Sequence, residues 1–165
     1  MRAKPTLSCA GISHLTSCPR RQNGEQIGRL LRNAKGFDGV FSPDTLPADP
    51  RLLVCNLDPS HREGTHWICI YVDGETGSGE YFDSLGRPPI ESLERYMNAA
   101  CSCRWRYNDR QLQSILSAFC GHYCVYFCML RSRGVSMNNI MASFSNDTAF
   151  NDYYVHSFVC RNLKK

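Results

Sequence analysis

The stretch from Gln113 to Cys128, QSILSAFCGHYCVYFC, constrains the fold and chemistry more than any other part of the chain. Cys120 stands at the predicted start of an apolar helix that runs to Arg131 and is stopped by Gly134. A helix N-terminus favours a thiolate, because its free N–H groups and the helix dipole stabilise negative charge. The same N–H groups can bind a developing oxyanion. The stretch therefore raises the hypothesis of a reactive cysteine at position 120.

A buried structural helix is the competing interpretation. Cys120, Cys124 and Cys128 recur at every fourth position, as thiols that face a core would. Two other residues favour chemistry instead. Gly121 lets the backbone turn tightly and a substrate carbonyl come close, and Gln113 offers a side-chain amide donor for an oxyanion hole.

A nucleophilic thiol needs a base, and His66 is the strongest candidate among the five histidines. It opens the clearest predicted strand, which runs to Val72, and the turn DGETGSG then predicts a hairpin with a returning strand from Glu80 to Asp83. In a hairpin the end of the second strand lies near the start of the first, so Asp83 can orient the ring of His66. A polar strand end and a turn residue are the plain alternatives for these two side chains.

The remaining patterns predict an α+β domain, with a small sheet packed against the central helix that starts at Cys120. Residues 37–50 are rich in turn formers, and residues 1–22 are expected to be a loosely ordered or accessory arm before a single domain over residues 23–165. Further elements are expected as a helix with an Asn23/Gln26 capping box, strands over 51–57 and 101–107, a helix over 90–100, and a last helix capped within 145–147.

The composition narrows the class of protein. The 165 residues carry a net charge of +4 and ten cysteines. Several cysteines lie inside apolar runs and the N-terminus has no apolar core of signal-peptide length, so we expect free thiols in an intracellular protein that is not secreted. No segment approaches the length of a membrane span. Cys9, His14 and Cys18 form only a weak metal-binding pattern, and no metal is expected.

Together these residues resemble the adenovirus protease (adenain) family, which shares a clan with the proteases that cleave SUMO and related modifiers. The resemblance rests on His66-Trp67, on Phe82-Asp83-Ser84-Leu85-Gly86 and on the Gln113 to Gly121 segment, and it covers about residues 25–160. It implies a papain-like cysteine endopeptidase with Cys120 as nucleophile, His66 as base, Asp83 as third member and Gln113 in the oxyanion hole. Adenoviral enzymes usually have glutamate where this chain has Asp83.

The resemblance also implies substrates and partners. Proteases of this family mature viral structural precursors, often at Gly-containing motifs, inside the infected cell or the virion. They act without a cofactor for the chemistry, and a short viral peptide, joined through a disulfide, and DNA stimulate them. Cys103 lies near the position of the disulfide-forming cysteine. A DNA-facing patch would use arginines, namely Arg104, Arg106, Arg110, Arg131 and Arg133. The protein is expected to be a monomer that contacts no membrane.

Two other functions stay open at this stage. One is a protease that removes ubiquitin-like modifiers, which would need a wide surface for a folded partner. The other is a non-catalytic binding module, or one held by zinc through Cys101, Cys103, Cys120 and His122.

Overall fold

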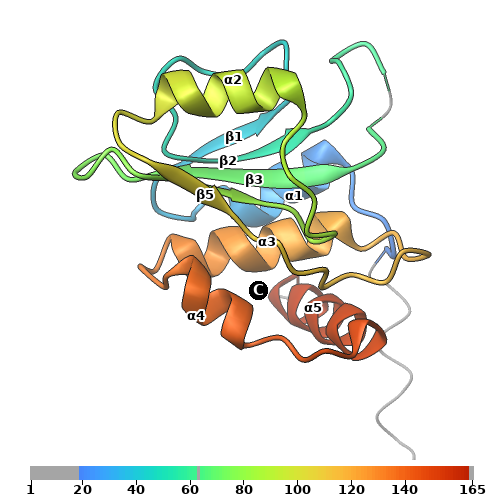
Figure 1. Cartoon of the computed structure of the whole chain (residues 1–165). Helices are drawn as coiled ribbons and strands as arrows, with labels where there is room; N and C mark the ends of the chain where they lie inside the picture. The colour runs from blue at the N-terminus through green and yellow to red at the C-terminus, as the bar shows by residue number, and fades with distance from the viewer. Residues whose placement is uncertain (1–18, 63, 164–165) are drawn as a thin grey trace, which may run out of the picture.

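The computed structural model describes residues 19–62 and 64–163 (Figure 1). The expected arm over residues 1–22 and the weak metal pattern of Cys9, His14 and Cys18 therefore lie largely or wholly outside the described residues. The helices are α1 (Gly24–Leu31), α2 (Glu91–Ala100), α3 (Cys120–Arg131), α4 (Met137–Ala142) and α5 (Thr148–Asn162). The strands are β1 (Phe37–Phe41), β2 (Leu52–Asn56), β3 (Trp67–Val72), β4 (Gly79–Phe82) and β5 (Trp105–Tyr107).

The five strands form one mixed sheet in the order β1-β2-β3-β4-β5. The central strands β2, β3 and β4 pair antiparallel, while β1 and β5 each run parallel to their neighbour. In the β3–β4 hairpin Cys69 pairs with Phe82, so His66 and Asp83 flank the same end of the hairpin. The hairpin expected from the turn sequence is confirmed.

Helices cover both faces of the sheet. Figure 1 shows α2 on one face and α3, α4 and α5 on the other. The alternation of β2 divides its side chains accordingly, since Leu52 and Val54 join the cluster around α3 whereas Leu53 and Cys55 join the cluster around α2. The α3 side holds the larger core, and residues 120–128 are all buried. The predicted α+β fold, with a small sheet against a helix that starts at Cys120, is confirmed.

Local signals explain most element boundaries. The Asn23 side chain accepts from Gln26 N–H and the Gln26 side chain accepts from Asn23 N–H, which is the predicted capping box of α1. Asp147 caps α5 through Ala149 N–H and Phe150 N–H. No helix among the described residues is long and apolar enough to cross a membrane.

Three elements differ from the sequence expectation. Residues 37–41 form strand β1 rather than turns, because they pair in parallel with β2. The Asp38 side chain adds to this pairing by accepting from Arg51 N–H and Leu52 N–H. Helix α4 was not predicted. It has six residues and follows the N-cap residue Ser136. The strand expected from residue 101 is shorter, because it pairs with β4 only over residues 105–107.

Candidate active site

The hairpin brings His66 and Asp83 into direct contact. His66 Nε2 lies 2.6 Å from Asp83 Oδ1, and the two side chains are 12% and 1% exposed. His66 stands just before β3 and Asp83 just after β4, so the strand pairing sets their separation. A buried carboxylate at this distance fixes the ring orientation and leaves the other ring nitrogen, Nδ1, for another group.

Asp83 is held from several sides. Its Oδ1 also accepts from Leu85 N–H at 2.8 Å. Asn108 accepts from Asp83 N–H at 2.8 Å and donates to the Asp83 carbonyl at 2.6 Å. Asn108 follows β5, so the parallel pairing of β4 and β5 delivers it. Sequence reasoning missed Asn108, because nothing local marks an asparagine after an edge strand as a partner of a distant residue.

Cys120 is the second group that acts on His66. Burial opposes a positive charge on the ring, but hydrogen bonds to Asp83 and to Cys120, together with the attraction of both groups, raise the pKa of His66 to about 9. The imidazole therefore carries a proton at neutral pH. An imidazolium next to the sulfur stabilises negative charge on it, which is the form that attacks a carbonyl.

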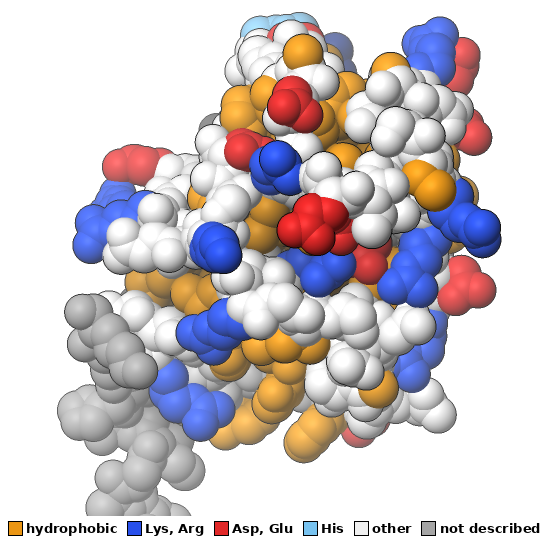
Figure 2. Space-filling model, turned by 90° about the vertical axis from the view of Figure 1, so that its left-hand side faces the viewer, with side chains coloured by type: hydrophobic (Ala, Val, Ile, Leu, Met, Phe, Trp, Pro, Cys, Tyr) orange, Lys and Arg blue, Asp and Glu red, His pale blue; other side chains and the backbone are white. Residues whose placement is uncertain are grey.

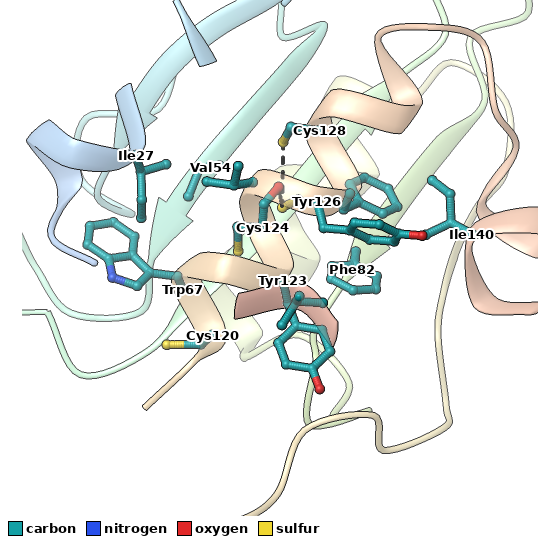
Figure 3. Close-up of a cluster of buried hydrophobic side chains, with 14 of the residues drawn as sticks. Ile27, Val54, Trp67, Phe82, Cys120, Tyr123, Cys124, Tyr126, Cys128 and Ile140 are labelled. Carbon is teal, nitrogen blue, oxygen red and sulfur yellow. Dashed lines mark hydrogen bonds between the residues drawn. The ribbon is translucent and has the colours of Figure 1, made fainter. Parts of the chain in front are cut away.

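Helix α3 places the sulfur at the edge of the core. Figure 3 shows Cys120 at the end of the helix, apart from Cys124 and Cys128. The N-cap residue Phe119 provides no side-chain acceptor for the first turn. Among the described residues no acceptor is recorded for Cys120 N–H or Gly121 N–H. Backbone donors at such a position can bind an oxyanion formed beside the sulfur.

Gln113 lies in the same region and is 3% exposed. Its Oε1 accepts from Ser84 Oγ at 2.7 Å, and its Nε2 donates to the Ser117 carbonyl at 2.9 Å. An amide nitrogen has two hydrogens, so one remains for a further acceptor. Ser84 therefore orients Gln113, a role that sequence reasoning did not assign, although Ser84 directly follows Asp83.

The reason for glycine at position 121 differs from the one expected. Gly121 is not among the described glycines with positive φ, so it makes no tight turn. A Cβ placed there would lie 2.8 Å from Gln22 Cβ and 3.2 Å from Ile27 Cδ1. Glycine at this position admits the close approach of the segment before α1.

The other two cysteines of α3 lie in the core, as the interpretation of this stretch as a buried structural helix expects. Cys124 and Cys128 are buried against Cys69, whose Sγ donates to the Cys124 carbonyl and lies 3.7 Å from Cys128 Sγ (Figure 3). Burial raises the pKa of Cys69 and raises that of Cys124 to about 11. The thiols of Cys69 and Cys124 therefore stay protonated at neutral pH and are poor nucleophiles.

The residues of the zinc alternative are not brought together. Cys101 packs in the cluster around α2, Cys120 lies in the cluster around α3, and Cys103 is exposed. Among the described residues no group of three or more metal-binding side chains could hold an ion. His122 points to other partners: its Nε2 lies 3.3 Å from His156 Nδ1, and burial followed by the charge of His156 lowers its pKa to about 3.

The sequence is distantly similar to two kinds of known protein. No family model matches the chain. It is 25% identical over 154 residues to the kinesin-like protein KIN-14G of Oryza sativa subsp. japonica, over 81% of this chain and 21% of that protein. It is 27% identical over 115 residues to the SUMO-1 cysteine protease of African swine fever virus, over 64% of this chain and 42% of that protease. The chain thus spans less than half the length of either relative.

Solved structures show which fold the chain shares. The African swine fever virus protease superposes with a TM-score of 0.57 at 17% identity, over 84% of this chain and 66% of that one. The SUMO protease Ulp1, with its catalytic cysteine oxidised to a sulfenic acid, gives 0.52 at 13% identity, over 93% and 84%. The chain therefore has the papain-like fold of this class of cysteine proteases. The resemblance to the clan of adenain and the SUMO proteases is confirmed at the level of the fold.

Proposed function

We propose that the chain is a cysteine peptidase in which Cys120 is the nucleophile, His66 the acid–base group and Asp83 its orienting partner. One observation supports this most directly. His66 forms a hydrogen bond with Asp83 through Nε2, and it also forms one with the side chain of Cys120. No separate structural role explains why a buried imidazole, carboxylate and thiol meet at the ends of three elements.

The reaction follows from these positions. The Cys120 thiolate attacks the peptide carbonyl carbon, a C–S bond forms, and the carbonyl electrons move to an oxyanion near the first turn of α3. The oxyanion then collapses, the C–N bond breaks, and the His66 imidazolium gives its proton to the leaving amine. Neutral His66 next takes a proton from water, which attacks the thioester and releases the acid and Cys120. Gln113 adds an amide donor to the oxyanion site.

Cys120→Ala tests the nucleophile. We expect no cleavage of a fluorogenic Gly-Gly peptide amide, with the melting temperature and circular dichroism of the parent retained. Cys124→Ala is the matched control, because that thiol lies one turn further along the same helix in the core. Wild-type cleavage by Cys120→Ala would refute the assignment.

For the natural substrate, we favour structural precursor proteins of a virus or a virus-like element, cut near glycine. The fold shared with the African swine fever virus protease supports a viral class of enzyme. Removal of a ubiquitin-like modifier is the second candidate, because that relative's name and Ulp1 both refer to SUMO. Kinetics on a SUMO–coumarin fusion and on its C-terminal peptide separate the two: a much larger kcat/KM for the folded fusion favours the modifier protease.

An activating peptide and DNA remain proposals. Cys103 is exposed, and a backbone hydrogen bond from Arg104 leads the causes that lower its pKa, which suits disulfide exchange. Three arginines of the proposed DNA patch already bind other groups of the protein. Arg106 and Arg131 pair with Glu80, and Arg110 donates to the carbonyls of Met141 and Phe144.

The basic side chains are also mixed with acidic ones. Figure 2 shows Lys and Arg interspersed with Asp and Glu on the face that it draws. A cavity of about 720 Å³ is lined by Lys35, Arg51, Arg131 and Arg133 but also by Asp73 and Glu75. The proposal of DNA activation is tested by measuring peptide cleavage with and without a DNA duplex, at low and at high salt. Phosphate contacts weaken as salt rises, so a stimulation through them should be lost at high salt.

We propose that the enzyme acts in a reducing compartment of the cell or in a virion. The eight described cysteines are all free thiols, including Cys69 and Cys128, whose sulfur atoms lie 3.7 Å apart. This pattern is typical of intracellular proteins.

A further inference from the structure

The segment from Pro19 to Gln22 runs between the two halves of the proposed active site. Gln22 is 1% exposed although it precedes the first helix. Its backbone carbonyl accepts from Trp67 Nε1 at 3.1 Å, and Trp67 is the residue after His66. Arg21 Nη2 donates to the Gly64 carbonyl at 2.6 Å, two residues before His66. The segment is therefore bound on both sides of the proposed base.

The same segment meets the helix of the proposed nucleophile. The Gln22 side chain packs on Gly121, where a Cβ would come within 2.8 Å. Gln22 Nε2 lies 3.4 Å from His122 Nε2, and the Pro19 carbonyl hydrogen-bonds to His122. These contacts fall on the two residues that follow Cys120.

We propose that Gln22 is a positioning residue, which fixes the start of β3 relative to the first turn of α3 and so sets the geometry between His66 and Cys120. This inference rests on the proposed function. Apart from this segment, β3 meets the interior of α3 through apolar packing and one long hydrogen bond, from Cys69 Sγ to the Cys124 carbonyl at 3.7 Å. Apolar contacts tolerate small shifts, whereas hydrogen bonds are directional. A misplacement of about 1 Å costs about 100-fold in rate, so catalysis needs such a link.

The stability of the fold does not explain Gln22. Its Oε1 is buried without a partner in the described part of the chain. A buried acceptor without a hydrogen bond destabilises a protein, so an apolar side chain of the same shape would be neutral or better for folding. Within the described residues, the Gln22 Oε1 thus adds no hydrogen bond to the stability of the fold, and the contact of Nε2 with His122 is the polar link that the side chain provides.

Two variants test the two links, both in a Cys103→Ser background so that the exposed thiol does not react. Gln22→Met keeps the packing on Gly121 but removes the amide at His122. Trp67→Phe keeps an aromatic ring but removes the donor to the Gln22 carbonyl. The readouts are kcat and KM for the Gly-Gly peptide, the pH dependence of Cys120 alkylation by iodoacetamide, and the melting temperature.

We expect each variant to lower kcat about tenfold with little change in KM. Alkylation of Cys120 at neutral pH should become slower, because an imidazolium held further from the sulfur stabilises the thiolate less. Gln22→Met should keep the melting temperature of the parent. Gln26→Ala is the control: it removes the capping box and lowers the melting temperature without moving the alkylation profile.

Unchanged kcat and an unchanged alkylation profile in both variants would overturn the positioning role. Failure of the proposed function looks different, since the Cys103→Ser parent would then show no Cys120-dependent cleavage. In that case the alkylation profile still reports whether Gln22 and Trp67 set the contact between Cys120 and His66.

Discussion

The proton on His66 connects the geometry of the site to its pH range. The ring is held between a buried carboxylate and a thiol, which raises its pKa to about 9. In the proposed mechanism, the leaving amine takes that proton. We therefore expect kcat/KM to fall as pH rises through about 9, measured on the Gly-Gly peptide in constant ionic strength. A profile that declines near pH 6.5, the ordinary histidine value, would contradict this contact geometry.

Asp83→Asn isolates the charge of the third residue. The amide has nearly the same shape, and Asn108 still holds the backbone of residue 83. We expect kcat to fall by about 10²- to 10⁴-fold and the alkaline limit to move to lower pH, because a neutral amide stabilises the imidazolium less.

A matched control for that variant lies on the same hairpin. Asp73→Asn makes the same change at the turn, where the side chain accepts from Glu75 N–H and Thr76 N–H. Equal losses in both variants would mean that the effect comes from the fold of the hairpin rather than from the site.

At the scale of elements, the start of α3 depends on a glycine for packing. Gly121→Ala would favour the helix by propensity but would place a Cβ against Gln22 and Ile27. We expect a net loss of about 1–3 kcal/mol in the free energy of unfolding, measured by urea denaturation.

Gly28→Ala provides the comparison in α1. The nearest atom to its added Cβ is Val40 Cγ2 at 3.7 Å, an ordinary contact. The substitution should stabilise the protein by about 0.5–1 kcal/mol. If both glycines behaved alike, the close approach of Gln22 to α3 would be wrong.

The elements also show what a sequence can and cannot predict. The capping box of α1, the β3–β4 hairpin and the start of α3 have local signals, and all three are present. Strand β1 has none, since Asp38 and Gly39 break its β pattern and only pairing with β2 makes it a strand. Helix α4 is too short for a periodic signal.

The same limit applies to the site residues. His66, Asp83 and Cys120 could be proposed because each stands at a recognisable element end, and Gln113 could be proposed from its spacing to Cys120. Their supporting residues, such as Gln22, Ser84 and Asn108, act through contacts between segments far apart in the chain. Such contacts have no periodicity or spacing in the sequence, so only the folded structure reveals them.

At the scale of the whole molecule, two histidines predict how stability varies with pH. The folded pKa of His66 is raised from 6.5 to about 9, so its contribution is complete below pH 6.5 and is lost as pH rises through about 9. Burial and then the charge of His156 lower the folded pKa of His122 to about 3, so its neutral form destabilises the fold progressively as pH falls below 6.5. Stability should therefore be greatest near pH 6.5.

Melting temperatures across the pH range check this expectation. His66→Gln should flatten the decline between pH 6.5 and about 9 while leaving the acid side unchanged. Two buried thiols titrate outside this pH range. Burial raises the pKa of Cys55 to about 12 and that of Cys124 to about 11, so these thiols lower stability only above pH 9, the ordinary thiol value. A curve without a maximum near pH 6.5 would contradict the assigned environments of the two rings.

The order of the strands has a consequence for when the protein could become active during its synthesis. The sheet is built in chain order, and the hairpin that joins His66 to Asp83 closes over a short stretch. Cys120 lies beyond all five strands, on a helix that docks on strands made much earlier. A nascent chain can therefore assemble its base and carboxylate while the sulfur is still inside the ribosome. The proposed peptidase activity would arise only when α3 emerges and docks on the sheet, so the growing polypeptide would not be cleaved by its own site before then.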